Sequence, residues 1–253
     1  MKLRGVLARI PGVVPPAALA DAVAAADDAP LVPGHTVQID QGFFIGGEPL
    51  IQRGTHDEQA GYRALANLKT DQLLAAIAEP SHSQGVFRYR DFLCAVTGRL
   101  SRSESRAQHT ADLPMQLRDN LRGRSESELF FHQILSNLHD ADPAYLTAAE
   151  LTAEVATAVL AKVLRQVVPD EQGPGVVAAL SHGELLVIAR RGSGSLRYQS
   201  LAEGQGPAAS QQLTLAVAEL GQAPPAAEPS EVPTGKALVL TARTARPTLL
   251  TLS

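Results

Sequence analysis

The chain of 253 residues has a single cysteine, Cys94, and no tryptophan. One cysteine excludes an intramolecular disulfide and any zinc site built from several cysteines. Aromatic residues make up only 4% of the chain, so aliphatic side chains must fill the core. No apolar run reaches the length of about 20 residues that a membrane helix needs, so we expect no membrane span.

An excess of basic residues is also absent, since 22 Lys and Arg stand against 26 Asp and Glu, a formal net charge of −4. Affinity for nucleic acid or for an anionic membrane comes largely from clustered Lys and Arg, so neither partner is expected. The stretch 98–128 is rich in arginine, but its acidic residues nearly cancel the charge. We interpret residues 101–124 as a solvated excursion over the surface rather than a basic binding patch.

The N-terminus does not read as a signal peptide, because Arg9 interrupts the apolar run too early, and we expect a cytoplasmic protein. With 45% hydrophobic and 19% charged residues, the chain can bury one substantial core. We therefore expect a single domain over residues 1–253. The Pro- and Ala-rich segment 221–233 is interpreted as a flexible surface segment rather than a domain boundary.

The local patterns run in the order strands, two long helices, and strands again. The first half is predicted to hold helices at 16–26 and 57–68 and strands at 3–10, 36–40, 43–45, 50–52, 73–78, 86–89 and 92–96. The second half is predicted to hold strands at 176–180, 185–189, 196–198, 237–241 and 248–252. This order is typical of an α+β protein with sheets stacked between helical layers.

The two clearest elements are helices that begin at capping boxes. Ser125 is followed three residues later by Glu128, ahead of an apolar series. Thr147 and Glu150 repeat the signal, and Pro169 ends that second helix. Its apolar positions recur at every fourth residue, namely Leu151, Val155, Val159, Val163 and Val167. We expect this face to pack in the core, with an oligomer seam as the alternative.

Two stretches stand out, residues 123–131 with the sequence Gly-Arg-Ser-Glu-Ser-Glu-Leu-Phe-Phe and residues 92–98 with the sequence Phe-Leu-Cys-Ala-Val-Thr-Gly. They resemble the class II glutamine amidotransferases. The first resembles the family's Thr-Asp-Ser-Glu start of a helix, and the second resembles the family's strand that ends in His-Asn-Gly. The segments 177–198 and 231–235 also resemble family features. The resemblance implies a four-layer αββα sandwich, in which two antiparallel sheets lie between helices as in N-terminal-nucleophile hydrolases.

The resemblance also implies a set of catalytic positions, and this chain departs from them. The family attacks glutamine with a cysteine directly after the initiator Met, where this chain has Lys2, which cannot take that role. The Asn of the oxyanion hole corresponds to Thr97, while the adjoining Gly is kept as Gly98; losing one such donor lowers the rate by about 10²–10³. The Asp that binds the α-amino group of glutamine corresponds to Glu126.

The arginine that pairs with the α-carboxylate of glutamine corresponds to Ala78, with Arg88 or Arg90 as the only replacements considered. We therefore expect a pseudoenzyme with no catalytic residue and no cofactor. Its vestigial pocket would consist of Lys2, Thr97, Gly98 and Glu126, with an ion pair between Lys2 and Glu126 filling the substrate's place. The expected role is binding, regulation or scaffolding for a protein partner that the sequence does not identify, and a homo-oligomer is left open.

Two other functions remain open at this point. An active amidohydrolase with a non-standard nucleophile would use Cys94 or a Ser or Thr near Thr97. A non-catalytic subunit would instead complete a larger enzyme. Cys94 itself is interpreted as a core thiol, because it lies in mid-strand between apolar residues with no His beside it.

Two further motifs are interpreted as structural. Glu128 and His132 stand four apart on a helix, with His139 two turns beyond, but two ligands without a third seldom hold a metal. We expect a surface pair there and no metal. Residues 192–195, Gly-Ser-Gly-Ser, are followed by no Lys and no helix, so we interpret them as a hairpin turn rather than a phosphate-binding loop.

Overall fold

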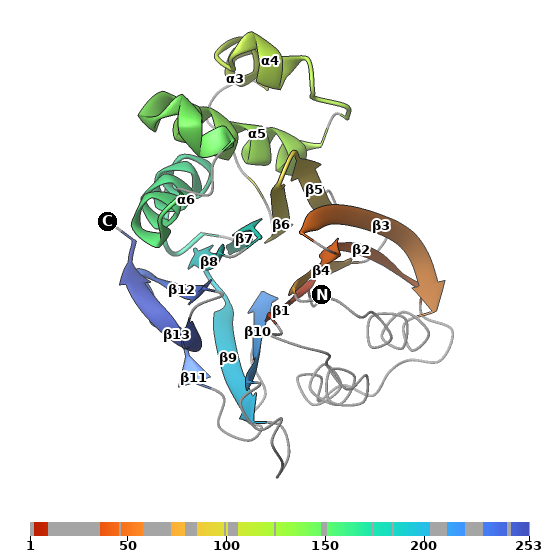
Figure 1. Cartoon of the computed structure of the whole chain (residues 1–253), viewed down its shortest axis with the longest axis vertical. Helices are drawn as coiled ribbons and strands as arrows, with labels where there is room; N and C mark the ends of the chain where they lie inside the picture. The colour runs from red at the N-terminus through yellow and green to blue at the C-terminus, as the bar shows by residue number, and fades with distance from the viewer. Residues whose placement is uncertain are drawn as a thin grey trace.

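Two antiparallel β-sheets stack face to face, and helices cover the outer face of one of them (Figure 1). The structure is a computed structural model. It describes residues 3–9, 36–45, 47–57, 72–78, 85–98, 100, 106–123, 125–147, 151–173, 175–183, 185–202, 212–220, 230–241 and 244–252. Within these ranges the strands pair only in the antiparallel sense.

The first sheet has the strand order β11-β9-β10-β1-β4-β2-β3. Its strands are β1 (Leu3–Arg9), β2 (Thr36–Ile45), β3 (Glu48–Asp57), β4 (Gln72–Ala78), β9 (Ser195–Ala202), β10 (Gln212–Leu220) and β11 (Ser230–Glu231). β1 lies between β10 and β4. We expected the first strand to share a sheet with all the strands between residues 73 and 96, but only β4 does so, because the strands at 86–89 and 92–96 belong to the second sheet. β3 forms one edge of this sheet.

The second sheet has the strand order β13-β12-β8-β7-β6-β5. Its strands are β5 (Gly85–Tyr89), β6 (Phe92–Gly98), β7 (Val176–His182), β8 (Leu185–Arg191), β12 (Lys236–Thr241) and β13 (Thr244–Thr251). β5 is an edge strand and contacts β2 and β3 of the first sheet. The edge strands β3 and β5 therefore lie on the same side of the sandwich.

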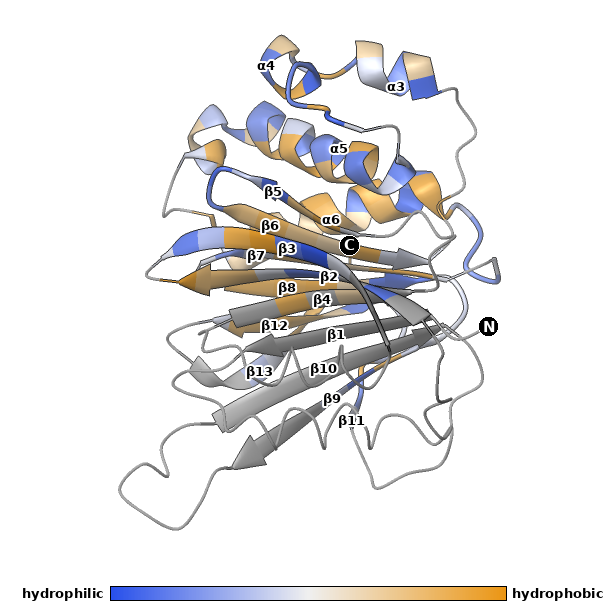
Figure 2. Cartoon of the chain, turned by 90° about the vertical axis from the view of Figure 1, so that its right-hand side faces the viewer, coloured by the Kyte–Doolittle hydropathy of each residue, from blue (hydrophilic) through white to orange (hydrophobic). Residues whose placement is uncertain are grey.

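Two helices, α5 (Glu126–Ala141) and α6 (Ala153–Val167), lie side by side against the second sheet, as Figure 2 shows from the side. The Ser125 hydroxyl caps α5 and the Thr152 hydroxyl caps α6, each accepting a backbone N–H of the first turn. The described ranges also hold α3 (Arg106–Ala111), α4 (Met115–Arg118) and the 3₁₀-helix η1 (Pro143–Leu146). Among these described helices, none is both long and apolar enough to cross a membrane.

The strand β6 separates two apolar cores. Phe92, Cys94 and Val96 belong to the core between the second sheet and the helices, whereas Leu93 and Ala95 belong to the core between the sheets. This division follows from the alternation of side chains along a strand. The helical side of the first core is formed by buried residues that include Phe130, Phe131, Ile134, Val159, Leu160 and Val163. The predicted core packing of α6 is thereby confirmed.

The α+β class is confirmed, and the described layers run helices, second sheet, first sheet. The helix predicted at 16–26 and all but the first residue of the helix predicted at 57–68 lie outside the described residues, so a fourth, helical layer stays a prediction. Asp57 ends β3 instead of opening a helix. The strands expected at 36–40 and 43–45 form one continuous strand, because Gln41 and Gly42 between them pair with β3 as well.

The connection at 192–195 is not a hairpin turn, because β8 belongs to the second sheet and β9 to the first. Gly192 and Gly194 have φ angles of 83° and 116°, a region that glycine enters at little cost, and here they carry the chain from one sheet to the other. β10 was not predicted at all. In the segment 221–233, Ser230 and Glu231 pair with β9 and Val232 is buried, so this part is not flexible surface.

The other two corrections concern the helical layer. Residues 106–123 are not merely a solvated excursion, because they form α3 and α4 and bury Leu113 and Leu117. The capping box at Thr147 does not begin a helix: Thr147 ends η1, and α6 starts only after Thr152. The chain takes the 3₁₀ turn at Thr147 because Pro143 starts η1 close behind α5, where the Asp142 carboxylate caps it.

Candidate functional site

Two of the four residues expected in the vestigial pocket lie at the end of β6. Thr97 is 4% exposed, and by the alternation of β6 its side chain lies on the same face as Leu93 and Ala95, toward the first sheet. Gly98 has a φ of 114°, a conformation that an L-residue with a side chain adopts only with strain, so glycine is required there. Lys2 lies outside the described residues.

The third described residue, Glu126, is the first residue of α5, which packs against β5 and β6. Its carboxylate lies 3.4 Å from the guanidinium of Arg106. The same guanidinium donates to the carbonyl oxygens of Ser125, at 2.8 Å, and Gly123, at 3.2 Å. Arg106 therefore holds together the start of the helix and the loop before it. No local sequence pattern indicates Arg106 as the partner of Glu126.

The positions considered for the carboxylate-binding arginine do not restore it near Thr97. Ala78 ends β4, opposite Gln38 of β2. Arg88 and Arg90 lie near the other end of the β5–β6 hairpin, where Tyr89 pairs with Phe92. Phe92 and Gly98 are six residues apart on a strand, which corresponds to roughly 20 Å.

Cys94 lies on the wrong face of the second sheet to act beside Thr97. Its side chain is fully buried in the core under α5 and α6, whereas Thr97 faces the first sheet. Burial raises the pKa of the Cys94 thiol far above its usual range, so the thiolate is strongly disfavoured. The interpretation of Cys94 as a core thiol is confirmed by this placement.

Glu128 and His132 are buried, not a surface pair, with exposed fractions of 7% and 3%. The Glu128 carboxylate accepts the backbone N–H groups of Arg122, at 2.8 Å, and Gly123, at 2.7 Å. His132 donates through Nδ1 to the carbonyl oxygen of Glu128 at 2.9 Å, and burial lowers the pKa of its imidazole. In the ranges described, no three His, Cys, Asp or Glu side chains gather as metal ligands would.

These two residues line a large hollow, the edge groove, with a volume of about 1240 Å³. It lies along the open side of the sandwich, between the edge strands β3 and β5 and the start of α5. Its lining comes from β2, β3, the β5–β6 hairpin, α4, the loop between α4 and α5, and α5 itself. The lining residues are Gln38, Asp40, Leu50, Ile51, Arg53, Phe87, Arg88, Tyr89, Arg90, Gln116, Asn120, Arg122, Gly123, Ser125, Glu128 and His132.

One wall of the edge groove is a polar bridge between the two sheets. Arg53 of β3 lies 3.4 Å from the carboxylate of Asp40 on β2 and donates to the carbonyl oxygen of Val86 on β5 at 2.9 Å. Its guanidinium also lies 5.7 Å from the centre of the Phe87 ring. Burial raises the pKa of Asp40, and the hydrogen bond from Gln38 and the charge of Arg53 partly oppose that rise.

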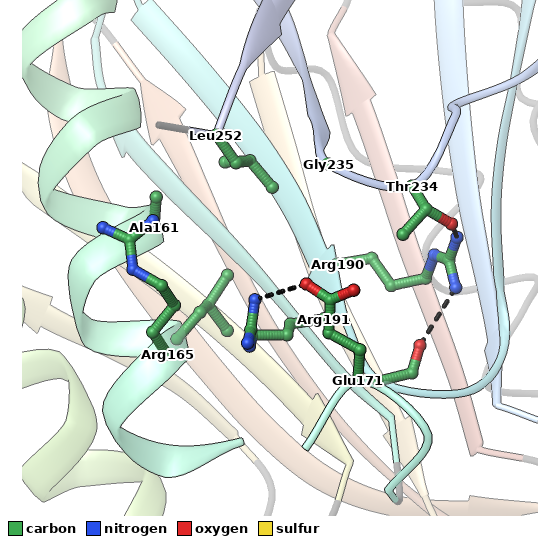
Figure 3. A pocket seen from close by; sticks show the side chains of 10 residues that line it. Ala161, Arg165, Glu171, Arg190, Arg191, Thr234, Gly235 and Leu252 are labelled. Carbon is green, nitrogen blue, oxygen red and sulfur yellow. Dashed lines mark hydrogen bonds and ion pairs between the residues drawn. The ribbon is translucent and has the colours of Figure 1, made fainter. Parts of the chain in front are cut away.

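A second, smaller hollow lies beside the C-terminal part of α6 and has a volume of about 50 Å³ (Figure 3). We call it the end hollow, and it is lined by Ala161, Leu164, Arg165, Glu171, Arg190, Arg191, Gly192, Thr234, Gly235 and Leu252. Arg191 pairs with Glu171 at 2.9 Å and donates to the carbonyl oxygens of Val168 and Pro169. Arg190 donates to two glycine carbonyls, of Gly192 and Gly194, and to the Thr234 hydroxyl.

Solved structures with the same arrangement identify the fold. A glutamine aminotransferase class-II domain protein from Silicibacter pomeroyi matches with a TM-score of 0.60 at 18% identity, over 99% of both chains. A predicted glutamine amidotransferase from Pseudomonas aeruginosa matches with a TM-score of 0.52 at 14% identity, over 96% of this chain and 94% of the other. The chain has a class II glutamine amidotransferase fold.

The same fold occurs as part of a larger enzyme. The glutamine phosphoribosylpyrophosphate amidotransferase from B. subtilis matches with a TM-score of 0.52 at 11% identity, over 100% of this chain and 49% of that one. No protein-family model matches the chain, and no curated protein is similar to it in sequence. At such identities the likeness shows the amidotransferase fold alone.

Proposed function

We propose that this protein is an amidotransferase-like pseudoenzyme, which does not hydrolyse glutamine and acts by binding, as a regulatory or scaffold partner of another protein. The observation that carries the proposal is the placement of Cys94. It is the chain's only thiol, and it lies buried on the face of the second sheet away from Thr97. A buried thiol held in its neutral form is a poor nucleophile.

The Arg106–Glu126 contact supports the same proposal. By the resemblance, Glu126 takes the place of the carboxylate that receives the α-amino group of glutamine. A guanidinium already lies 3.4 Å from this carboxylate and is tied to two neighbouring carbonyls. A substrate ammonium would have to approach Glu126 beside a fixed positive charge, which lowers its affinity.

Glutamine hydrolysis by the purified protein tests the proposal directly. Ammonia release from glutamine and from a γ-glutamyl amide is measured for the wild type and for Cys94→Ala. We expect both proteins to match the buffer blank. Turnover that is lost in Cys94→Ala would overturn the proposal in favour of a thiol enzyme, and turnover that survives the substitution would favour another nucleophile, such as a Ser or Thr near Thr97.

Glutamine binding gives a second readout that does not need turnover. Because a ligand stabilises the native state in proportion to its occupancy, we expect no rise in melting temperature with glutamine up to millimolar concentration. A rise that disappears in Glu126→Ala would show that the pocket accepts the amino acid. Size-exclusion chromatography of the protein purified from its native host tests whether it binds a protein partner. Elution as a free monomer at native concentration would count against a partner.

A further inference from the structure

The edge groove carries three arginines that pair with no carboxylate of the described residues. Arg88, Arg90 and Arg122 line it, and in the described ranges none of them forms an ion pair. Toward the part of the chain that the structure describes, Arg88 donates only through Nε, to the carbonyl oxygen of Arg90 at 3.3 Å. All three residues are exposed. Most of their N–H donors are therefore available to a ligand.

The two carboxylates that line the groove already have hydrogen-bond or ion-pair partners within the protein. Asp40 accepts from Gln38 and lies beside Arg53, and Glu128 accepts two backbone N–H groups. The lining thus holds four arginines and two carboxylates, a formal charge of 4 − 2 = +2 with His132 neutral. A concave, low-dielectric surface concentrates such a field, although the chain as a whole is acidic.

Arg90 is held in an unusual backbone conformation at the tip of the β5–β6 hairpin. Its φ of 49° lies in the left-handed region, which costs a residue with a side chain about 1 kcal/mol or more relative to glycine. The guanidinium lies 5.4 Å from the centre of the Tyr89 ring. A position that favours glycine thus carries an arginine that lines the groove.

We propose that the edge groove binds a small molecule that carries at least two oxyanion groups, either phosphates or carboxylates. A guanidinium offers paired N–H donors that match both groups in geometry. Arg88 and Arg90 approach from the hairpin and Arg122 from the loop before α5, so a ligand with two anionic groups can contact both sides of the groove. Its volume of about 1240 Å³ admits a ligand of nucleotide size or larger.

This site is separate from the vestigial pocket, since Thr97, Gly98 and Glu126 are not among the residues that line it. The proposal stands whether or not the protein hydrolyses glutamine. Its test uses different ligands and different variants from those of the hydrolysis assay, so the two can fail independently.

Calorimetric titration of the full chain at low ionic strength tests the proposal. The probes are pyrophosphate for the phosphate class, citrate for the carboxylate class, and potassium chloride at matched ionic strength. The variants are Arg88→Ala and Arg122→Ala. Arg118→Ala is the matched control. It removes the same charge, but Arg118 is an exposed residue of α4 that does not line the groove.

We expect saturable binding of at least one probe, weakened about fivefold by each groove substitution and unchanged in Arg118→Ala. Whether pyrophosphate or citrate binds more tightly assigns the ligand to phosphates or carboxylates. Two results would overturn the proposal: no saturable binding of either probe, or an equal loss in Arg118→Ala. Circular dichroism of each variant confirms that a loss of binding is not a loss of fold.

Discussion

The edge groove and the end hollow are both lined by arginines, but the two sets of arginines have opposite roles. In the end hollow, Arg190 and Arg191 donate to carbonyl and side-chain oxygens of the protein. In the edge groove, Arg88, Arg90 and Arg122 leave most of their donors without a partner among the described residues. The occupation of guanidinium donors, rather than the number of arginines, separates a structural cluster from a candidate binding site.

The largest effect should come from the end hollow. Arg191→Ala removes one ion pair and two hydrogen bonds to backbone carbonyls, and leaves the carbonyl of Val168 without its donor at 2.5 Å. We expect the free energy of unfolding to fall by about 2–3 kcal/mol. Urea unfolding measures it, with the slope of the transition unchanged. A loss below about 0.5 kcal/mol would show that this cluster is as dispensable as a surface arginine.

A smaller loss of stability is expected at low pH, and it concerns His132, which lines the edge groove. Burial lowers the pKa of His132 below its ordinary value of 6.5, so the unfolded chain binds a proton that the folded chain does not. Stability is therefore full above about pH 6.5 and declines as the pH falls toward the folded pKa, by at most about 1.4 kcal/mol per pH unit.

His132→Asn tests the source of this decline, because the shorter amide can still donate to the Glu128 carbonyl but does not titrate. Melting temperatures between pH 5 and pH 8 should show a shallower decline in the variant. Some decline should remain, since burial lowers the pKa of His182 as well. An unchanged profile would mean that His132 does not contribute to the acid sensitivity.

The smallest effect should come from the groove arginines. Arg88→Ala and Arg122→Ala should each change the free energy of unfolding by less than about 0.5 kcal/mol, because neither side chain contacts a carboxylate or a buried carbonyl of the described residues. The same urea titration as for Arg191→Ala measures both. A loss above about 1.5 kcal/mol would place these residues with the structural arginines and end the contrast between the two hollows.

Local signals in the sequence predicted the elements better than their contacts. Ser125 correctly marked the start of α5, because capping is a property of adjacent residues. The hydrogen-bond partners of Glu128 were not predicted. In a capping box its carboxylate would accept the backbone N–H of Ser125, but it accepts the backbone N–H groups of Arg122 and Gly123 instead. Thr147 failed as a helix start because η1 uses it for a different turn. Competing local structures cannot be ranked without the packing around them.

The edge groove had no signature in the sequence. Asp40, Arg53, Arg88 and Arg122 come from separate segments, and only the pairing of β2 with β3 and the contact of β5 with both bring the first three together. Glu126 was identified as a site residue from the resemblance, but its ion pair with Arg106 crosses 20 positions of chain. Contacts of this kind depend on tertiary structure, which no periodicity records.

The bridge made by Arg53 has a consequence for how the edge groove meets a ligand. It fixes the first sheet to the second at their open edges, through one ion pair and one hydrogen bond of defined geometry. The apolar core between the sheets sets their spacing, and Arg53 adds a polar contact of defined length at the edge. A groove held at a fixed width is preorganised, so its ligand spends little free energy on ordering the walls. Affinity there depends chiefly on how the exposed guanidiniums exchange water for oxyanion.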